Sequence, residues 1–225
     1  MNGIKGWLGE KKTSLIVWLS LSRKTYRRFN NVIIPSKNGT TQIDHLIISP
    51  FGVFIIETKN KKGWIFGSAN KPTWTQVLYD NRFSFQNPFR QTYRQKKILS
   101  AFLDLDESKV HPIVYFVGDC KFKTPMPGNV IRKRLASHIK RYTEHVFSTP
   151  EVERIISAIE KHLSESDLTS RDHRHSLRER LSSTDTCPKC GSKLVERSIK
   201  NGPRAGETFL GCESFPNCRF SRSTG

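Results

Sequence analysis

Three charged residues interrupt one of the most apolar parts of the sequence. The stretch 41–60 reads TQIDHLIISPFGVFIIETKN and carries Asp44, Glu57 and Lys59 inside two strand-like runs. Side chains two residues apart on a strand point to the same face, so Glu57 and Lys59 are expected side by side, with Asp44 facing them from the preceding strand. An ionised carboxylate is costly in a core, and two facing carboxylates repel each other. Without a cation beside them, at least one of the two acids would be protonated.

A divalent metal ion is the cation that this set fits. Carboxylate oxygens suit Mg²⁺ or Mn²⁺, so Asp44 and Glu57 are the expected ligands, and Lys59 stays close as a fixed positive charge. Such a site supports hydrolysis of a phosphodiester: the metal polarises the phosphate and helps to deprotonate a water, and Lys59 positions that water or stabilises the developing charge. The alternative that the pattern leaves open is a salt bridge between Lys59 and one of the two acids.

A second set of chemically capable residues lies near the end of the sequence. Cys187 and Cys190 form one closely spaced pair, and Cys212 and Cys218 form another after 21 intervening residues. Two thiolate pairs separated by a hairpin-length segment are typical of a tetrahedral zinc site, and four protein ligands leave no open position for catalysis. A module of about 40 residues has too little core to fold alone, so Zn²⁺ is expected to be structural. Cys120 is expected to be a buried or half-buried thiol.

The acidic pair needs a hairpin to bring its members together. The runs 42–48 and 53–58 predict two strands around the turn Ser49-Pro-Phe-Gly52, where proline and glycine take their preferred type I positions. Both faces of these strands are apolar, which predicts a sheet covered on both sides.

The remaining elements predict an α/β fold, with a mixed central sheet flanked by helices. Residues 1 to about 28 are expected to be helical, and Asn38-Gly39 is a turn signal. Further predicted elements are a hairpin of 73–79 with 82–85, a helix from about 89 to 103, a buried strand at 111–117, and helices at 130–141 and 151–163. The predicted layout is one large domain at 1–162, a polar linker at 163–184 with room for a short helix, and the cysteine module at 185–225.

The charge of the chain favours a polyanionic partner. The formal net charge is +18 over 225 residues, and nucleic acid is the first candidate for such an excess; a merely basic surface and an anionic membrane are the alternatives. Most of the excess lies in residues 1–162, whereas 163–184 holds four basic and four acidic residues. The apolar run 14–21 is too short to span a bilayer and lacks a cleavage site, so the protein is expected to be cytoplasmic without membrane attachment.

Several motifs occur together in a recognisable order. They are Gly6-x-x-Gly9-Glu10, Gln42-Ile-Asp44-His, Gly52-Val-Phe-Ile-Ile-Glu57-Thr-Lys59-Asn, Gly63-x-Ile65-x-Gly67, Trp74, and Asn87-Pro-Phe-Arg-Gln91. Over about residues 6–117 the chain thereby resembles the nuclease-related domain, NERD, a branch of the PD-(D/E)XK nuclease superfamily. The resemblance implies a restriction-endonuclease-like fold. The superfamily also contains inactive binding modules.

The resemblance also assigns roles to single residues. The implied catalytic set is Asp44, Glu57, Lys59, Glu10 and Gln91. The Thr58 carbonyl is implied as a third metal ligand, and Glu10 as the residue that completes the metal shell or holds Lys59. Gln42 lies on the Asp44 face and is a further candidate for the site. The alternatives are a solvated charge at Glu10 and an ordinary polar helix face at Gln91.

The cysteine module resembles the C-terminal zinc finger of bacterial type IA DNA topoisomerases. Such ribbons bind single-stranded DNA or partner proteins. In this sequence, phenylalanine side chains would stack on bases and arginines would meet phosphates. The candidate contact residues are Arg197, Arg204, Phe209, Phe215 and Arg219, with Phe220 beside them. The alternative is that the phenylalanines form the miniature core of the ribbon, which is expected of at least one of them.

These features together predict a Mg²⁺- or Mn²⁺-dependent deoxyribonuclease, expected to be an endonuclease, with a zinc ribbon that holds DNA. The resemblance implies 3′-hydroxyl and 5′-phosphate ends. One alternative is a nuclease-fold module that binds nucleic acid without cutting it, and another is an adaptor to a DNA-processing partner. DNA repair, restriction and mobile-element maintenance are all compatible with this activity. The sequence leaves open whether the protein forms a homodimer.

Overall fold

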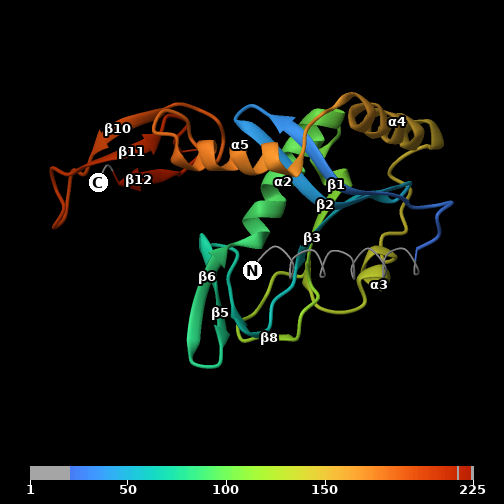
Figure 1. Cartoon of the computed structure of the whole chain (residues 1–225), viewed down its shortest axis with the longest axis horizontal. Helices are drawn as coiled ribbons and strands as arrows, with labels where there is room; N and C mark the ends of the chain where they lie inside the picture. Colours follow the sequence, from blue (N-terminus) through green and yellow to red (C-terminus); the bar gives the residue numbers. More distant parts are fainter. Residues whose placement is uncertain (1–20, 217, 224–225) are drawn as a thin grey trace. The chain divides into compact units, whose positions relative to one another are not determined.

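The computed structural model describes residues 21–216 and 218–223, which divide into two compact units. The large unit comprises 21–34 and 42–167, and the small unit comprises 35–41 and 168–223 among these residues. Figure 1 labels their helices and strands. Within the described residues, no helix is both long and apolar enough to span a bilayer.

The main sheet of the large unit is mixed. Its strand order is β1 (Arg27–Ser36), β2 (Gly39–Ser49), β3 (Gly52–Lys59), β7 (Val110–Phe116) and β9 (Val130–Ile131). Strands β2 and β3 form the antiparallel hairpin that the sequence predicted, and β3 then pairs in parallel with β7. The carboxyl end of β3, where Glu57 and Lys59 lie, is therefore an interior strand end flanked on both sides.

Helices cover both faces of this sheet, as the apolar strands predicted. On one face, α2 (Pro88–Leu103) and α4 (Thr149–Glu165) contribute Leu99 and Ile155 to a core with Leu46 and Ile55. On the other face, the short helix α3 (Leu135–Ile139) packs against the remaining strand residues. Burial of apolar side chains in both layers is the main driving force that holds the sheet between its helices.

A second sheet extends the large unit. Its strand order is β6 (Asn81–Gln86), β5 (Thr73–Leu78), β4 (Gly63–Phe66) and β8 (Cys120–Phe122). A short 3₁₀ helix, η1 (Glu107–Lys109), precedes strand β7 of the main sheet. Trp74 and Phe116 stack with ring centroids 6.2 Å apart, which joins the core of this sheet to β7. Cys120 is fully buried in the same cluster, and burial raises the pKa of its thiol.

The start of helix α2 is tied to the loop before β5. Asn87 caps the helix by accepting a hydrogen bond from the Phe89 amide, and its own side-chain amide donates to the carbonyls of Ser68, Ala69 and Lys71. Pro88 at the first helical position needs no amide partner. These contacts fix the first turns of α2, which carry Gln91, over the end of β3.

Two predicted elements differ in the structure. A helix over residues 1–28 was expected; residues 1–20 lie outside the described part, and the end of the prediction is wrong, because Arg27 begins strand β1. Val32 and Ile34 are fully buried in the sheet, and this burial favours a strand over a helix in the segment. A helix over 130–141 was also expected, but Val130–Ile131 form β9, and only Leu135–Ile139 are helical. Arg134 separates the two, since its left-handed backbone (φ 57°) cannot continue a helix.

The other predicted elements are confirmed with small changes of boundary. They are the hairpin β2–β3, the hairpin β5–β6, helix α2, strand β7 and helix α4.

The small unit combines a turn, a helix and a ribbon. It contains the β1–β2 turn at 35–41, helix α5 (Ser170–Ser182), and the antiparallel strands β10 (Leu194–Ser198), β11 (Thr208–Cys212) and β12 (Ser221–Ser223). Much of the segment 163–184, expected as a polar linker with room for a short helix, is thus helical. Arg222 attaches the ribbon to α5 by donating hydrogen bonds to the carbonyls of Ser183 and Leu181.

Candidate active site and zinc centre

Asp44, Glu57 and Lys59 meet on one face of the β2–β3 hairpin. The register pairs His45 with Ile56, and its continuation sets Asp44 opposite Glu57. The Asp44 Oδ2 atom accepts a hydrogen bond from the Thr58 amide at 2.9 Å. Glu57 is 3% exposed, and its Oε1 atom lies 2.5 Å from the Lys59 ammonium. The salt bridge that the sequence left open is therefore present.

Helix α2 supplies two glutamines to the same cluster. The Lys59 ammonium donates to Gln91 Oε1 at 3.1 Å. One turn later, the Gln95 side-chain amide donates to Glu57 Oε2 at 2.9 Å and to the Gln42 carbonyl at 2.8 Å. Gln91, Gln95 and Leu99 follow the i, i+4 spacing of one helix face, so the polar site continues the apolar contact between α2 and the sheet.

Gln95 is the site residue that sequence reasoning missed. It is 1% exposed, which is unusual for a glutamine, and it fixes the second oxygen of Glu57. The spacing from Gln91 is the signal that could have found it, once the face of α2 was known. Gln42 contributes to the cluster through its carbonyl, while its side chain donates to Asn31 Oδ1.

This cluster combines a buried acid, Glu57, and a half-buried acid, Asp44, with the lysines Lys59 and Lys61. Lys61 lies near Lys59: burial lowers the pKa of Lys61, and the Lys59 charge lowers it further. The Gln95 Oε1 atom is buried without a hydrogen-bond partner among the described residues. An acceptor of this kind marks a place for a further donor, such as a water. The oxygen-rich donor set of Asp44, Glu57 and the neighbouring carbonyls fits a hard divalent cation.

The structure thus brings together most of the residues that the sequence singled out. Those that lie in one cluster are Asp44, Glu57, Thr58, Lys59 and Gln91. Glu10 lies outside the described residues.

His45 points away from this cluster, as expected for a packed core histidine. It is 4% exposed, and its Nδ1 atom lies 2.7 Å from Asn30 Oδ1. Burial lowers the pKa of His45 to about 4. Its imidazole is therefore neutral at pH 7.

This burial predicts a pH dependence of stability. Because the folded pKa is about 4 and the unfolded value about 6.5, the unfolded chain binds more protons between these values, and stability falls as pH drops through this window. We expect His45 to account for a loss of about 2 kcal/mol between pH 7.5 and pH 5. Urea unfolding at both pH values measures it. The His45→Asn variant, which retains a donor for Asn30, should show a smaller pH dependence than wild type; an unchanged dependence would contradict the assignment.

The four cysteines of the small unit form a compact cluster. Their sulfur atoms all lie within 4.8 Å of one another, with Cys187 and Cys218 at 3.7 Å and Cys190 and Cys212 at 3.4 Å. A tetrahedral zinc ion with Zn–S bonds of about 2.3 Å separates its sulfurs by about 3.8 Å. The cluster thus has the ligands and dimensions of a structural zinc site.

The protonation of these thiols also favours a bound cation. Burial raises the pKa of Cys218 to about 12. Burial alone would raise the pKa of Cys190, but hydrogen bonds from Ser192 and from neighbouring cysteines outweigh this effect and lower the pKa to about 6. Four thiolates so close together, three of them buried, need a compensating positive charge.

One face of the ribbon carries an arginine between two aromatic rings. The Arg197 guanidinium lies 6.0 Å from the ring centroid of Phe215, which is 58% exposed. A Cβ atom at Gly211 would lie 2.9 Å from the Arg197 side chain and 3.3 Å from the Phe209 ring, so this glycine lets both approach the strand. Phe209, Arg197 and Phe215 therefore share one surface of the ribbon.

The remaining candidates on the ribbon differ in their surroundings. Arg204 pairs with Glu207 at 2.6 Å, and Arg219 is exposed. Phe220 packs with the cysteines and Leu194, so it belongs to the miniature core, as expected for at least one phenylalanine.

Comparison with known families assigns each unit a counterpart. Residues 5–117 match the model of the nuclease-related domain, NERD, and residues 184–224 match that of the topoisomerase DNA-binding C4 zinc finger.

Individual relatives cover parts of the chain. An uncharacterized protein of Bacillus anthracis is 42% identical over 101 residues, which is 44% of this chain and 47% of that protein. DNA topoisomerase 1 of Methanothermobacter thermautotrophicus is 42% identical over 69 residues, 31% of this chain and 9% of that protein. The uncharacterized protein YrdD of Escherichia coli is 50% identical over 38 residues, 17% of this chain and 18% of that protein. The chain thus spans less than half the length of each of these relatives.

Proposed function

Because the chain belongs to the nuclease-related domain family, we propose that it is a metal-dependent deoxyribonuclease that hydrolyses phosphodiester bonds at the Asp44–Glu57–Lys59 cluster. The observation that carries the proposal is the convergence of two acids and a lysine on one strand face under helix α2, with Glu57 held from both sides. A purely structural ion pair would need one acid and one base, and it would not need the second carboxylate across the strand.

Asp44, Glu57 and the Thr58 carbonyl are the proposed ligands of Mg²⁺ or Mn²⁺. When bound, the metal would supply a Lewis acid for the phosphate and lower the pKa of a bound water. Glu57 is pre-positioned for this task because Gln95 holds its Oε2 atom at 2.9 Å. The hydrogen bond from the Thr58 amide similarly restrains Asp44, at 2.9 Å. Glu10 is proposed to complete the site.

Lys59 is the proposed catalytic lysine. Its side chain is 19% exposed, and its ammonium is held between Glu57 at 2.5 Å and Gln91 at 3.1 Å. In this position it would orient a water or stabilise the negative charge that develops on the phosphate. Gln91 acts as the positioning residue, since it holds the ammonium from the side of the helix.

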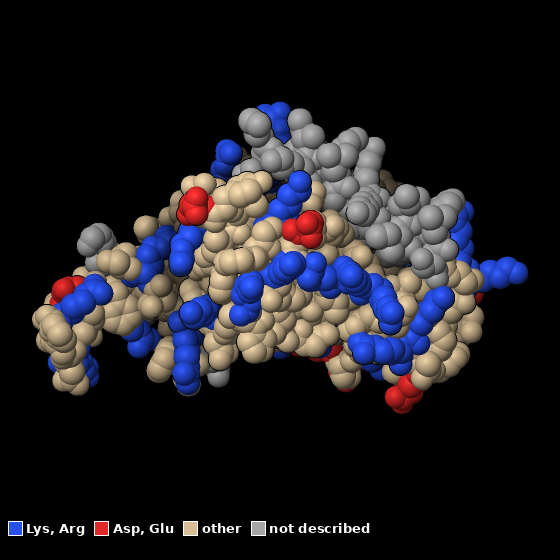
Figure 2. Space-filling model, turned by 90° about the horizontal axis from the view of Figure 1, so that it is seen from below, with Lys and Arg blue, Asp and Glu red and all other residues tan. Residues whose placement is uncertain are grey.

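The small unit is proposed to hold the DNA, and the excess of positive charge on the surface to attract it. Figure 2 shows that Lys and Arg cover much more of the displayed face than Asp and Glu. On the ribbon, Phe209 and Phe215 would stack on bases while Arg197 meets phosphates. Arg204 and Arg219 are additional proposed phosphate contacts. A reducing, cytoplasmic setting would keep the four zinc thiolates available.

The competing function is a binding module that does not cut. It is favoured by the Glu57–Lys59 pair, which already satisfies both charges without a metal. Under this alternative the protein would bind nucleic acid, or serve as an adaptor to a DNA-processing partner, through its charge and its ribbon.

Incubation with circular DNA separates these functions. We expect purified protein with Mg²⁺ or Mn²⁺ to cut supercoiled plasmid, single-stranded circular DNA, or both. Cutting of a closed circle establishes endonuclease action, and the circle that is cut gives the strand preference. Linear product from plasmid would favour a homodimer that cuts both strands. Tight, salt-sensitive binding with no cutting of either circle in either metal would support the binding module instead.

A further inference from the structure

Helix α5 has two opposite faces with different roles. His173, Ser176 and Arg180 recur at i, i+3 and i+7, and Arg171, Arg174 and Arg178 repeat the same spacing on the opposite side of the helix. The first three are partly buried, and the second three are exposed. The segment has no net charge when counted along the sequence, but three of its four arginines are gathered on one side of the helix.

The first face fixes the helix to the β1–β2 turn. Ser176 accepts a hydrogen bond from the Thr40 amide at 2.9 Å, and His173 Nδ1 lies 2.9 Å from Thr40 Oγ1. Arg180 donates to the Thr40 carbonyl at 3.2 Å, and burial lowers its pKa. Gly39 allows this approach, because a Cβ atom there would lie 2.1 Å from Ser176 Oγ. Three contacts to one residue set the rotation of α5 and turn the opposite face outward.

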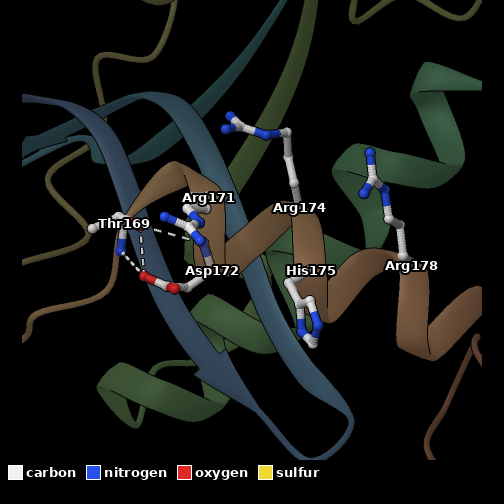
Figure 3. Close-up of a pocket in the computed structure, with 6 residues that line it drawn as sticks. All are labelled: Thr169, Arg171, Asp172, Arg174, His175 and Arg178. Carbon is white, nitrogen blue, oxygen red and sulfur yellow. Dashed lines mark hydrogen bonds between the residues drawn. The ribbon is translucent and has the colours of Figure 1, made fainter.

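The outward face lines a groove of about 830 Å³. Figure 3 shows Arg174 and Arg178 extending from α5 on the same side, one turn apart. The lining residues are Thr169, Arg171, Asp172, Arg174, His175 and Arg178.

The acids near this groove have other partners. Asp172 Oδ2 accepts hydrogen bonds from the Thr169 amide and hydroxyl, closing the capping box of the helix. Glu179 lies 3.3 Å from His175. Among the described residues, none of the three groove arginines pairs with a carboxylate. In the described part of the chain, no ion pair within 4 Å thus neutralises these three arginines, although the pKa of the neighbouring Asp172 is lowered by its hydrogen bonds from Thr169 and, to a smaller extent, by the charge of Arg171.

We propose that the groove of Arg171, Arg174 and Arg178 binds the phosphate backbone of nucleic acid. Successive arginines rise about 4.5 and 6 Å along the helix axis, so they can meet neighbouring phosphates of one strand, and a guanidinium matches a phosphate with two parallel hydrogen bonds. Among the described residues that line the groove, none has an apolar side chain that would enter a bilayer, which favours nucleic acid over a lipid surface. The segment between the two family matches is then a binding element. This proposal requires no cleavage.

Binding of a fluorescent 20-nucleotide single strand tests the groove. Anisotropy is measured in the full chain carrying Glu57→Gln, with zinc bound and no added Mg²⁺, from 50 to 200 mM KCl. For R171Q/R174Q/R178Q we expect affinity to fall about 10- to 100-fold at 0.1 M salt, and the slope of log K against log salt to fall by about 2, since each phosphate contact contributes about 0.7. Arg→Lys at all three positions should keep the slope.

A charge-matched control uses exposed lysines of the large unit. K24Q/K140Q/K161Q removes the same three charges and should change affinity less than threefold, with the slope unchanged. Equal losses in both triple variants, or wild-type binding by the arginine variant, would overturn the proposal. The proposal would also be overturned if the arginine variant lost binding to phosphatidylserine vesicles while its DNA binding stayed intact. Since cleavage is not measured, a failure of the nuclease proposal would leave this result unaffected.

Discussion

Glu57→Gln is expected to lower metal-dependent DNA cleavage by about 10³-fold, the scale seen when a principal electrostatic contact of a catalytic site is removed. Glutamine keeps the size of the side chain, and its Oε1 atom can still accept a hydrogen bond from Lys59. Its Nε2 atom can only donate, so the Gln95 amide must turn to present its Oε1 atom, which has no partner among the described residues. The new side chain lacks the negative charge that a divalent cation requires. Folding should change little, because the side chain would keep one hydrogen bond to Lys59 and one to the turned Gln95 amide. Initial cleavage rates with saturating Mg²⁺ measure the effect.

Lys59→Met should lower cleavage by a similar factor for a different reason. Methionine keeps the apolar stem and removes the ammonium, so the acids remain able to hold metal while the charge near the phosphate is lost. The matched control is Lys62→Met, which removes an exposed lysine three residues away. It should retain activity within a few-fold. Equal activity in wild type and Glu57→Gln, or equal losses in Lys59→Met and Lys62→Met, would contradict the assigned roles.

The second large effect concerns zinc. Cys187→Ser is expected to abolish the single equivalent of bound zinc and to unfold the ribbon, because structural zinc sites in small modules contribute about 10–16 kcal/mol of apparent binding energy to folding. Leu194 and Phe220, which pack with the cysteines, provide too small a core to replace it. Zinc content by a colorimetric chelator assay and protease resistance of residues 185–225 measure the two parts of this effect.

Cys120→Ala serves as the control for thiol loss. Cys120 is fully buried in the large unit, far along the chain from the zinc cluster. Its replacement should lower stability modestly and leave one equivalent of zinc bound. Zinc retained at full stoichiometry in Cys187→Ser would contradict a four-cysteine site.

The sequence could predict those parts of the site that depend on strand periodicity. Asp44, Glu57 and Lys59 share a face because side chains alternate along a strand, and the hairpin turn set their register. The zinc site could likewise be predicted from a local feature, the spacing of the cysteines in the sequence. Gln95 could not be found from such local patterns, because its role depends on how α2 lies across the sheet. That placement is a tertiary feature, fixed in part by the Asn87 contacts to a distant loop.

The missed elements have similar causes. Strand β1 lacks a clear alternation, and its identity follows from pairing with β2 and burial of Val32 and Ile34. The helix predicted over 130–141 is interrupted because Arg134 adopts a left-handed backbone conformation, which cannot be predicted from an arginine in the sequence. For α5, charge counted along the chain concealed two opposite faces, and only the contacts to Thr40 reveal which face is free.

Titration with Mn²⁺ tests most directly whether Asp44 and Glu57 form a metal site. Free Mn²⁺ is followed by electron paramagnetic resonance in zinc-loaded wild type, Asp44→Asn and Glu57→Gln; Mn²⁺ does not displace zinc from four thiolates. We expect one Mn²⁺ site in wild type, lost or weakened at least tenfold in both variants, and retained in Lys59→Met. The same Mn²⁺ binding in all four proteins, or none in wild type, would contradict a metal-dependent active site and leave the acids with a structural role.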